Sequence, residues 1–572
     1  MYIDVVPNRG SPPAILLRES VREGRRIRKR TLANLSSWPP DKVEMLRRLL
    51  RGETLVPPQD AFEIVRTRPH GHVAAVLGTV HRLGLEHLIA SKPSRQRPLV
   101  VAMIAARLLK PRSKLATARG LGQDTLSSSL GEVLGVEGAD EDALYEAMDW
   151  LLARQERIEA ALARRHLGEG TLVLYDVTSV TYEGRTCPLM QWGHPRDGRR
   201  GKPQILFGLL CNASGCPVAV EVFAGHTGDP LTLSAQVARI RQHFGLQRVV
   251  LVGDRGMLTE ARLREDLQPA QLDWITALRA PQVHQLVRDG VLQLSLFDER
   301  DLAEIASPAY PGERLIVCRN PLLADERARK REALLQATEQ ELARIAQATR
   351  RAQRPLRGRE QIALRVGQVI NRFKVGKHFR WELTDETFTY ERDQTRIAQE
   401  TALDGIYVIR TTVPAAVLGA DEAVRAYKRL STVERAFRSF KSLDLKVHPI
   451  HHRLEDRVRS HVFLCLLAYY VEWHMRQALA PLLFDDDDKA AGEARRASIV
   501  APAQRSPRAL RKAQTKHTDD GLPVHSFQTL LDDLQTVAKN RVRAGGIAFD
   551  MITTPTPLQQ RAFDLLGVSY RL

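Results

Sequence analysis

Three carboxylates stand in sequence contexts that suit metal-assisted chemistry on phosphodiesters. Asp176 lies in the middle of an apolar, β-branched run, and Asp254 ends a second apolar run. Glu434 lies in AYKRLSTVERAFRSFK, residues 426–441. A carboxylate in a buried strand must be paired or metal-bound, because an unpaired buried charge is costly. Mg²⁺ binds carboxylate oxygens and keeps several waters, so two or three acids suffice to hold it.

Each acid also has a structural alternative. Asp176 could pair with a nearby Arg or Lys, Asp254 could form a turn with the glycine that follows, and Glu434 could make ion pairs along a helix flank. If the two strands lie side by side and the helix crosses their rim, the three acids converge. Cations held there would polarise a phosphoryl oxygen and lower the pKa of an attacking water.

The helix predicted over residues 426–441 carries two stripes. At about 100° per residue, Tyr427, Glu434 and Lys441 fall on one line, and Arg438 follows one turn after Glu434. The neighbouring line is apolar, which predicts a face packed inward. It consists of Ala426, Leu430, Val433, Phe437 and Phe440.

The elements around the two aspartates alternate between strand and helix patterns. Their order is β-β-β-α-β-α-β, which predicts a mixed α/β sheet with helices on both faces and suits an RNase H-like domain. The predicted elements are a strand from residue 171, a hairpin of 205–211 and 217–223, a helix over 231–244, a strand over 248–253, a helix over 260–267 and a strand over 274–278.

The segments on either side of this domain indicate a function less clearly. Residues 14–35 predict a hairpin, and its basic residues could lie along phosphates or form a solvated strand. The patterns of residues 41–168 predict helices throughout, with long helices at 99–109 and 142–164. This region could recognise DNA, or it could be a purely structural helical bundle. The basic residues of the hairpin are Arg25, Arg26, Arg28, Lys29 and Arg30.

We expect six segments. Within the last two of them, a helix over 456–477 should cap the sheet. Residues 485–521 are predicted to be a surface linker, and the tail from residue 527 is predicted to be a small appendage. The segments are a basic hairpin arm (1–40), a helical DNA-binding region (41–168), the first part of the catalytic domain (169–280), a large insertion (281–403), its second part (404–484), and a linker with C-terminal appendage (485–572).

Composition narrows the class of protein. The 572 residues include 85 Lys and Arg against 67 Asp and Glu, a net charge of +18 that favours a polyanionic partner. Five scattered cysteines without a CxxC pair indicate neither a disulfide framework nor a zinc site, and fit a reducing cytoplasm. His448, His451 and His452 lack a fourth ligand at zinc spacing. No membrane-length apolar run and no phosphate-cradling ATP motif occur.

The strings YDVTS around Asp176, GDRGM around Asp254, and Tyr427, Glu434 and Lys441 at seven-residue spacing resemble the DDE transposases of bacterial insertion sequences that carry a Tyr-Arg-Glu-Lys signature. The first two acids are 78 residues apart and the last two 180, and the long second gap resembles the insertion that such enzymes carry. The resemblance extends over residues 170–477.

The resemblance implies roles for these residues. Asp176, Asp254 and Glu434 would be catalytic and hold two Mg²⁺ ions, with Mn²⁺ as a substitute, and Tyr427 and Lys441 would contact DNA. The arginine of the signature is replaced by Leu430 here. Arg429 or Arg438, the two nearest cations, would then make the DNA contact of that arginine.

The resemblance also implies a function. The protein would bind terminal inverted repeats, cleave the DNA ends and transfer them to a target duplex, working without ATP as a homodimer or higher oligomer in the cytoplasm. Two alternatives remain at this stage. One is a structure-selective nuclease without strand transfer, and the other is a DNA-binding protein whose catalytic domain is inactive.

Overall fold

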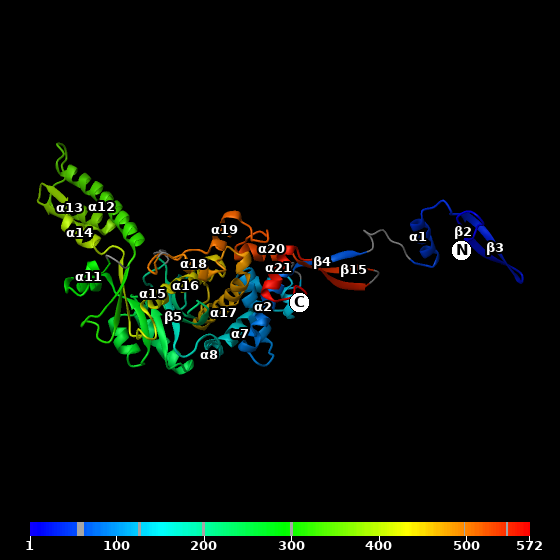
Figure 1. Ribbon diagram of the computed structural model, residues 1–572, viewed down its shortest axis with the longest axis horizontal. Helices are drawn as coiled ribbons and strands as arrows, with labels where there is room; N and C mark the ends of the chain where they lie inside the picture. The colour runs from blue at the N-terminus through cyan, green and yellow to red at the C-terminus, as the bar shows by residue number, and fades with distance from the viewer. Residues whose placement is uncertain (54–61, 124–126, 197–200, 298–300, 497, 545–546) are drawn as a thin grey trace. The chain divides into compact units, whose positions relative to one another are not determined.

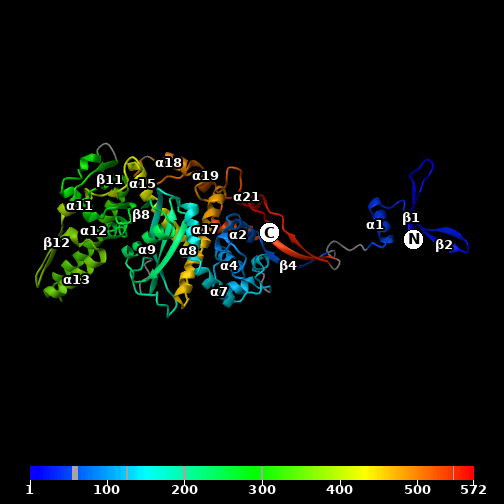
Figure 2. The same ribbon diagram turned by 90° about the horizontal axis from the view of Figure 1, so that it is seen from below.

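The computed structural model describes residues 1–53, 62–123, 127–196, 201–297, 301–496, 498–544 and 547–572 (Figures 1 and 2). The chain forms two compact units, and each draws on the C-terminal tail. The first comprises Met1–Arg68 with Ala538–Thr553, and the second comprises Pro69–Val537 with Thr554–Leu572.

The first unit is built on two small antiparallel sheets. β1 (Tyr2–Val6), β2 (Ala14–Glu23) and β3 (Arg26–Asn34) form one, followed by α1 (Pro40–Leu50). The predicted hairpin is confirmed, since β2 pairs with β3. In the other sheet, β4 (Glu63–Pro69) joins β15 (Ala538–Ala544) and β16 (Ile547–Ile552). The prediction of helix throughout 41–168 is therefore wrong at β4. There the β-branched residues pair as a strand with β15, from the distant C-terminal tail.

The second unit contains the large sheet. β5 (Thr171–Thr181), β6 (Gln204–Asn212) and β7 (Pro217–Ala224) run antiparallel to one another. β8 (Val249–Gly253) is parallel to β5, and β9 (Asp273–Ala277) is parallel to β8. This confirms the predicted mixed sheet and its order of strands and helices.

Beyond β9 the sheet continues with β14 (Ile406–Thr411), the strand with which the core domain was predicted to resume. Two strands of the segment predicted as an insertion then extend it, β11 (Arg314–Arg319) and β10 (Leu302–Ile305), giving the order β10-β11-β14-β9-β8-β5-β6-β7. α11 (Ala280–Arg288) packs against β11 and β14. The remaining elements of the segment share a small core of their own at one end of this unit (Figure 1). They are α12 (Pro321–Thr349), α13 (Arg359–Phe373), β12 (Phe379–Leu383), β13 (Phe388–Arg392) and α14 (Gln394–Thr401).

Helices cover both faces of the sheet. On one face the Phe207 ring of β6 lies 5.6 Å from that of Phe437 in α16 (Leu430–Arg438). On the other, Gln236 of α9 (Leu233–Ala238) donates a hydrogen bond to Glu221 of β7. The edge strand β7 is covered as well, because the Val220 N–H donates to Glu159 of α8 (Gln155–His166). An exposed strand edge would invite pairing with other chains.

The helical region and the tail pack together. The helix predicted at 142–164 is two helices with a break at Ala153 and Arg154, where the Arg154 guanidinium lies over the Trp150 ring. The tail is no appendage, because α20 (Phe527–Gln535) contacts α2 and α21 (Pro557–Leu566) contacts α17 (Figure 2). The helices are α2 (Gly71–Arg82), α3 (Leu85–Ile89), α4 (Gln96–Leu109), α5 (Lys114–Leu121), α6 (Leu130–Leu134), α7 (Glu141–Leu152), α8 (Gln155–His166) and α17 (Glu455–Leu479).

The predicted linker is partly ordered helix. α18 (Lys489–Ala494) and α19 (Pro507–Thr515) lie within it, and α19 buries Ala509 and Lys512. In the described part of the chain, no helix combines the length and the apolar character that a bilayer crossing requires.

Candidate active site

Asp176 and Asp254 lie beside each other because their strands are parallel neighbours. Tyr175 of β5 is in register with Gly253 of β8, so the next residue in each strand direction is an aspartate. Adjacent strands are about 4.8 Å apart. Asp254 therefore stands just outside the carboxyl end of β8, where α/β sheets commonly gather ligands.

The strand register decides which face Asp176 occupies. Asp176 pairs with Leu209 and Thr178 pairs with Phe207, so all four side chains share one face. The Phe207 ring packs on Phe437 of α16, which places that helix over this face. Glu434 precedes Phe437 by one helical turn and thus approaches the same rim.

Tyr175 points to the opposite face. A β-carbon added at Gly208 would lie 2.5 Å from the Tyr175 hydroxyl, so only glycine admits this ring. Tyr175 is buried, and its close packing on Gly208 of β6 holds β5 in place next to Asp176.

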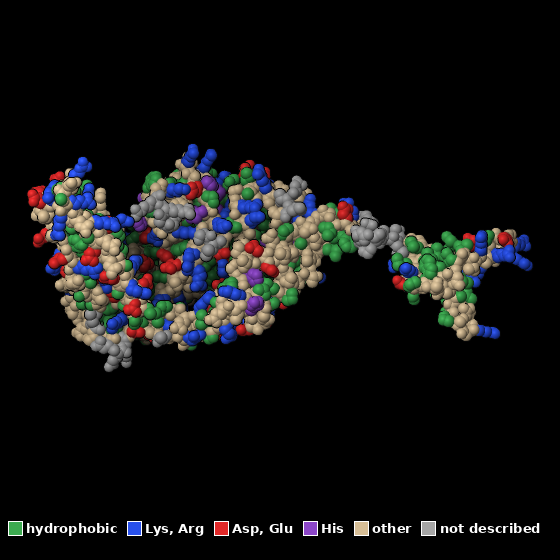
Figure 3. All heavy atoms as spheres, turned by 90° about the horizontal axis from the view of Figure 1, so that it is seen from above, with side chains coloured by type: hydrophobic (Ala, Val, Ile, Leu, Met, Phe, Trp, Pro, Cys, Tyr) green, Lys and Arg blue, Asp and Glu red, His purple; other side chains and the backbone are tan. Residues whose placement is uncertain are grey.

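One cavity of about 600 Å³ brings the three carboxylates together. Tyr427 also lines it, and its hydroxyl donates a hydrogen bond of 3.4 Å to Asp254 Oδ1. In this region the surface is hollowed, with acidic side chains in the hollow and Lys and Arg around it (Figure 3). The lining residues are Asp176, Asp254, Asn320, Leu323, Tyr407, Tyr427, Lys428, Leu430, Ser431 and Glu434.

The three cations proposed from sequence do not line this cavity. Arg429 and Arg438 are exposed on the helix, and Lys441 is half-buried in the turn after it. Arg429 lies at a break, because the predicted single helix is α15 (Ala420–Lys428) followed by α16 and a π-turn over Ser439–Leu443. The apolar stripe itself is confirmed: Ala426, Val433, Phe437 and Phe440 are buried, and Leu430 is partly buried.

Burial governs the charge of Asp176. Its pKa is raised to about 6, first by burial and then by the negative charges of Asp254 and Glu434. The Val177 N–H, which donates to Asp176 Oδ1 at 2.8 Å, and the Arg196 guanidinium oppose this shift. The carboxylate is thus only partly compensated by the protein.

Arg196 is a member of the site that the sequence patterns did not indicate. Its guanidinium donates to the Val177 carbonyl and forms an ion pair with Asp229. Its charge favours the ionised form of Asp176, and Arg196 itself has a lowered pKa because of burial. Arg196 comes from the connection between β5 and β6, which has no motif, so no spacing pointed to it.

The donor set fits a hard divalent cation. All three groups are carboxylates, the ligands that Mg²⁺ prefers, and a dication would compensate the partly buried Asp176. Among the described residues, only His166, Cys216 and His474 bring three potential ligand atoms within 4.8 Å of one another. The oxygens of the three carboxylates are therefore not all within 4.8 Å of one another.

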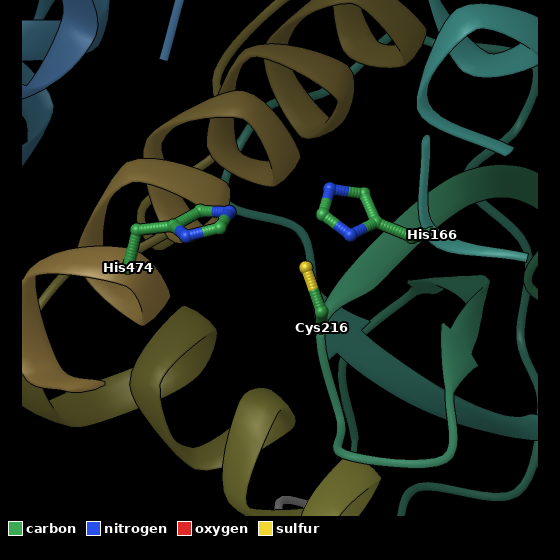
Figure 4. A group of neighbouring side chains, drawn as sticks. All are labelled: His166, Cys216 and His474. Carbon is green, nitrogen blue, oxygen red and sulfur yellow. The ribbon is translucent and has the colours of Figure 1, made fainter. Parts of the chain in front are cut away.

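The His166, Cys216 and His474 group lies elsewhere (Figure 4). The three side chains come from the end of α8, the start of β7 and α17, and they point toward one another. Imidazole and thiol suit softer metals than Mg²⁺. Both imidazole rings also pack edge-on against Tyr470. Sequence spacing did not reveal this group because its members are far apart along the chain.

The basic hairpin arm belongs to the first unit. Its basic residues are exposed on the β2–β3 hairpin, and the ion pairs of Arg28, Lys29 and Arg30 are each 3.7 Å long. These are Arg25, Arg26, Arg28, Lys29 and Arg30.

Comparison with known proteins gives two family matches. A transposase DDE domain model matches residues 168–471, more than half of the chain, and a model of the IS1634 family transposase N-terminal domain matches residues 3–57. No curated protein matches. Among solved structures, the cryo-EM structure of a piggyBac transposase synaptic complex with hairpin DNA is 9% identical, with a TM-score of 0.33 over 71% of this chain and 72% of that chain. The chain belongs to the transposases with a DDE domain and is an insertion-sequence transposase.

Proposed function

We propose that Asp176, Asp254 and Glu434 are the catalytic metal ligands of this transposase and that they hold two Mg²⁺ ions, for which Mn²⁺ can substitute. The observation that carries the proposal is that these three acids, remote in sequence, line one cavity. When bound, such ions polarise the phosphoryl oxygen and stabilise the leaving oxygen.

The surrounding residues position the acids. Tyr427 holds Asp254 through its hydroxyl, and the Gly256 N–H donates to the other oxygen of Asp254 at 3.1 Å. Arg196 keeps Asp176 ionised at neutral pH and could contact a phosphate as a fork of donors. The open cavity leaves Glu434 exposed to a strand laid across the rim.

The proposed reaction has two steps on DNA. Water attacks the phosphodiester at the end of the element, which leaves a 5′-phosphate on one side and releases a 3′-hydroxyl on the other. That hydroxyl then attacks a phosphodiester of the target duplex in line, forms the new bond to its phosphorus and displaces the target's own 3′-hydroxyl. The basic hairpin arm and the helical region would bind terminal inverted repeats, with Arg429, Arg438 and Lys441 contacting DNA outside the cavity. A homodimer or higher oligomer would hold two ends together.

The test is cleavage of a duplex that carries the element's own ends, in Mg²⁺ and in EDTA. We expect nicks and joined products with the wild type in Mg²⁺. Asp176→Asn, Asp254→Asn and Glu434→Gln should each abolish both products while binding persists. Normal cleavage by any one of these folded variants would refute its assignment, and nicks without joined products would support the nuclease alternative.

A further inference from the structure

A second cavity, of about 480 Å³, lies between α4, α5, α17 and the loop that follows the Glu434 helix. Its walls are strongly basic, and none of its described lining residues is Asp or Glu. Asp149, which lies 3.7 Å from the Arg457 guanidinium, is not part of the lining. The lining cations are Arg107, Arg112, Lys114, Arg453 and Arg457.

Lys114 is the most informative of these cations. Its side chain is 5% exposed, yet in the described part of the chain its ammonium has no hydrogen bond or ion pair. Burial and the charge of Arg107 lower the pKa of Lys114 to about 7. A buried cation that is not compensated by the protein is costly, so this position is suited to an anion from outside.

Another buried lysine shows how the chain compensates such a charge for structural purposes. Lys512 is 1% exposed, and its ammonium lies 3.2 Å from Asp487 Oδ1 and donates to the carbonyls of Ala480 and Asp485. Lys114 has no such set. Among the residues that the structure describes, the acceptors of Arg107 beside it are backbone carbonyls, such as that of Lys446 at 3.3 Å.

The histidines of the cavity offer hydrogen-bond donors and bring no negative charge. His452 and His461 have lowered pKa values, through burial and then through neighbouring cations, and so they are neutral. The buried Nδ1 of His461 has no hydrogen-bond partner among the described residues. α5 also begins here, with Ser113 as its N-cap and Lys114 as its first residue. A helix N-terminus carries a partial positive charge that favours anions.

We propose that this basic cavity binds a backbone phosphate of the DNA strand on which the carboxylate site acts. The proposal rests on the proposed function. Its geometric support is the β5 strand, because Tyr182, six residues beyond Asp176, donates a hydrogen bond of 3.0 Å to the His452 carbonyl in the cavity wall. At about 3.3 Å per residue, Asp176 and Tyr182 are roughly 20 Å apart along the chain, and the cavity wall lies at the end of the Tyr182 side chain.

That separation suits a single duplex. Phosphates follow one another on both strands of a duplex at ~3.4 Å of helix axis per nucleotide, so a duplex of ordinary length has phosphates at about this distance from the cleaved bond. A DNA end with its scissile bond at the carboxylates would thus present another phosphate to the basic cavity. The loop 444–454 joins the Glu434 helix to α17, so a phosphate held here would also fix the position of that helix.

The experiment compares Lys114→Met with Arg119→Met in the full chain. Arg119 is exposed on the same helix and does not line the cavity. Arg119→Met therefore serves as the control, because it also removes one positive charge. Binding of the end-containing duplex is measured in EDTA, which removes any dependence on cleavage. We expect Lys114→Met to bind about tenfold more weakly and to reduce the slope of log affinity against log salt by about one, with a smaller change for Arg119→Met.

Three further readouts separate the possible outcomes. Lys114→Met should unfold at a higher temperature, since a buried charge is replaced by an apolar side chain, so weaker binding could not be ascribed to misfolding. When the phosphates near the cleaved bond are ethylated one at a time, one of them should impair binding by the wild type and not by Lys114→Met. Pyrophosphate should stabilise the wild type only weakly at constant ionic strength.

Two results would overturn the proposal. Unchanged DNA binding by Lys114→Met together with strong, Lys114-dependent stabilisation by pyrophosphate would assign the cavity to a free phosphate compound. Unchanged binding without such stabilisation would make Lys114 a structural residue. If instead the wild type failed to bind end DNA at all, the proposed function would fail before this site was tested.

Discussion

At the scale of single residues, the ionisation of Asp176 is the central feature of the site. Its pKa in the fold is about 6, above the ordinary value of 3.8, chiefly because of burial. Such a group stabilises the fold fully below its unfolded pKa, and that contribution is lost as pH rises through about 6. Asp176→Asn should therefore unfold at a higher temperature than the wild type at pH 8 in EDTA, and at the same temperature near pH 4.

Mg²⁺ should reverse this order at pH 8. Metal that binds only the folded wild type raises its midpoint, whereas Asp176→Asn, lacking a ligand, should respond little. Thermal unfolding with and without Mg²⁺ checks both halves of the prediction. A variant that responds to Mg²⁺ as the wild type does would remove Asp176 from the ligand set.

Tyr427 should have a modest effect. Its hydroxyl makes one 3.4 Å hydrogen bond to Asp254, and burial together with the charge of Asp254 raises the pKa of Tyr427, so it remains a neutral donor. Loss of about 1 kcal/mol of positioning predicts about fivefold slower single-turnover cleavage for Tyr427→Phe. A loss as complete as that of Asp254→Asn would mean that the hydroxyl contacts the reacting groups.

At the scale of elements, the packing of α16 on β6 positions Glu434. Phe437 is 6% exposed and its ring packs edge-on against Phe207. Phe437→Ala should cost about 3–5 kcal/mol of stability and slow cleavage at temperatures where the protein is still folded, whereas Phe437→Leu should cost less than about 1.5 kcal/mol. Chemical denaturation and cleavage rates on the same samples test this, and an unaffected rate in Phe437→Ala would show that Glu434 is held by other contacts.

The sequence predicted those elements whose patterns are local. A run buried on both faces identifies β5, and parallel pairing with β8 then follows from the order of strands and helices, so the meeting of Asp176 and Asp254 was predictable. The break at Arg429 was not, because both halves keep the same apolar periodicity. Arg196 was not predictable either, since a connection without regular structure gives no register from which to place its side chain.

At the scale of the whole molecule, long-range pairing decides what sequence patterns miss. β4 and β15 are neighbours in one sheet although more than 460 residues separate them. Likewise, β10 and β11 lengthen the large sheet, where a separate insertion domain was expected. Such partners depend on which edges are free after the rest of the chain has folded, and local composition does not record that.

The basic hairpin arm provides a prediction at this scale. Replacing Arg26, Arg28, Lys29 and Arg30 with Gln should weaken binding of end DNA. The slope of log affinity against log salt should become shallower by about 0.9 for each phosphate that the arm no longer neutralises. The thermal midpoint should stay unchanged, since these side chains are exposed. Titrations at several salt concentrations measure affinity and slope together, and an unchanged salt slope would show that the hairpin does not lie along phosphates.

The most direct test of the central claim is to locate bound metal. Crystals of the full chain with end DNA and Mn²⁺, measured at the manganese absorption edge, would reveal the ions by anomalous scattering. The account predicts two peaks about 3.5–4 Å apart, each coordinated by oxygens of Asp176, Asp254 or Glu434. Peaks located elsewhere, with these three carboxylates left without metal, would contradict it.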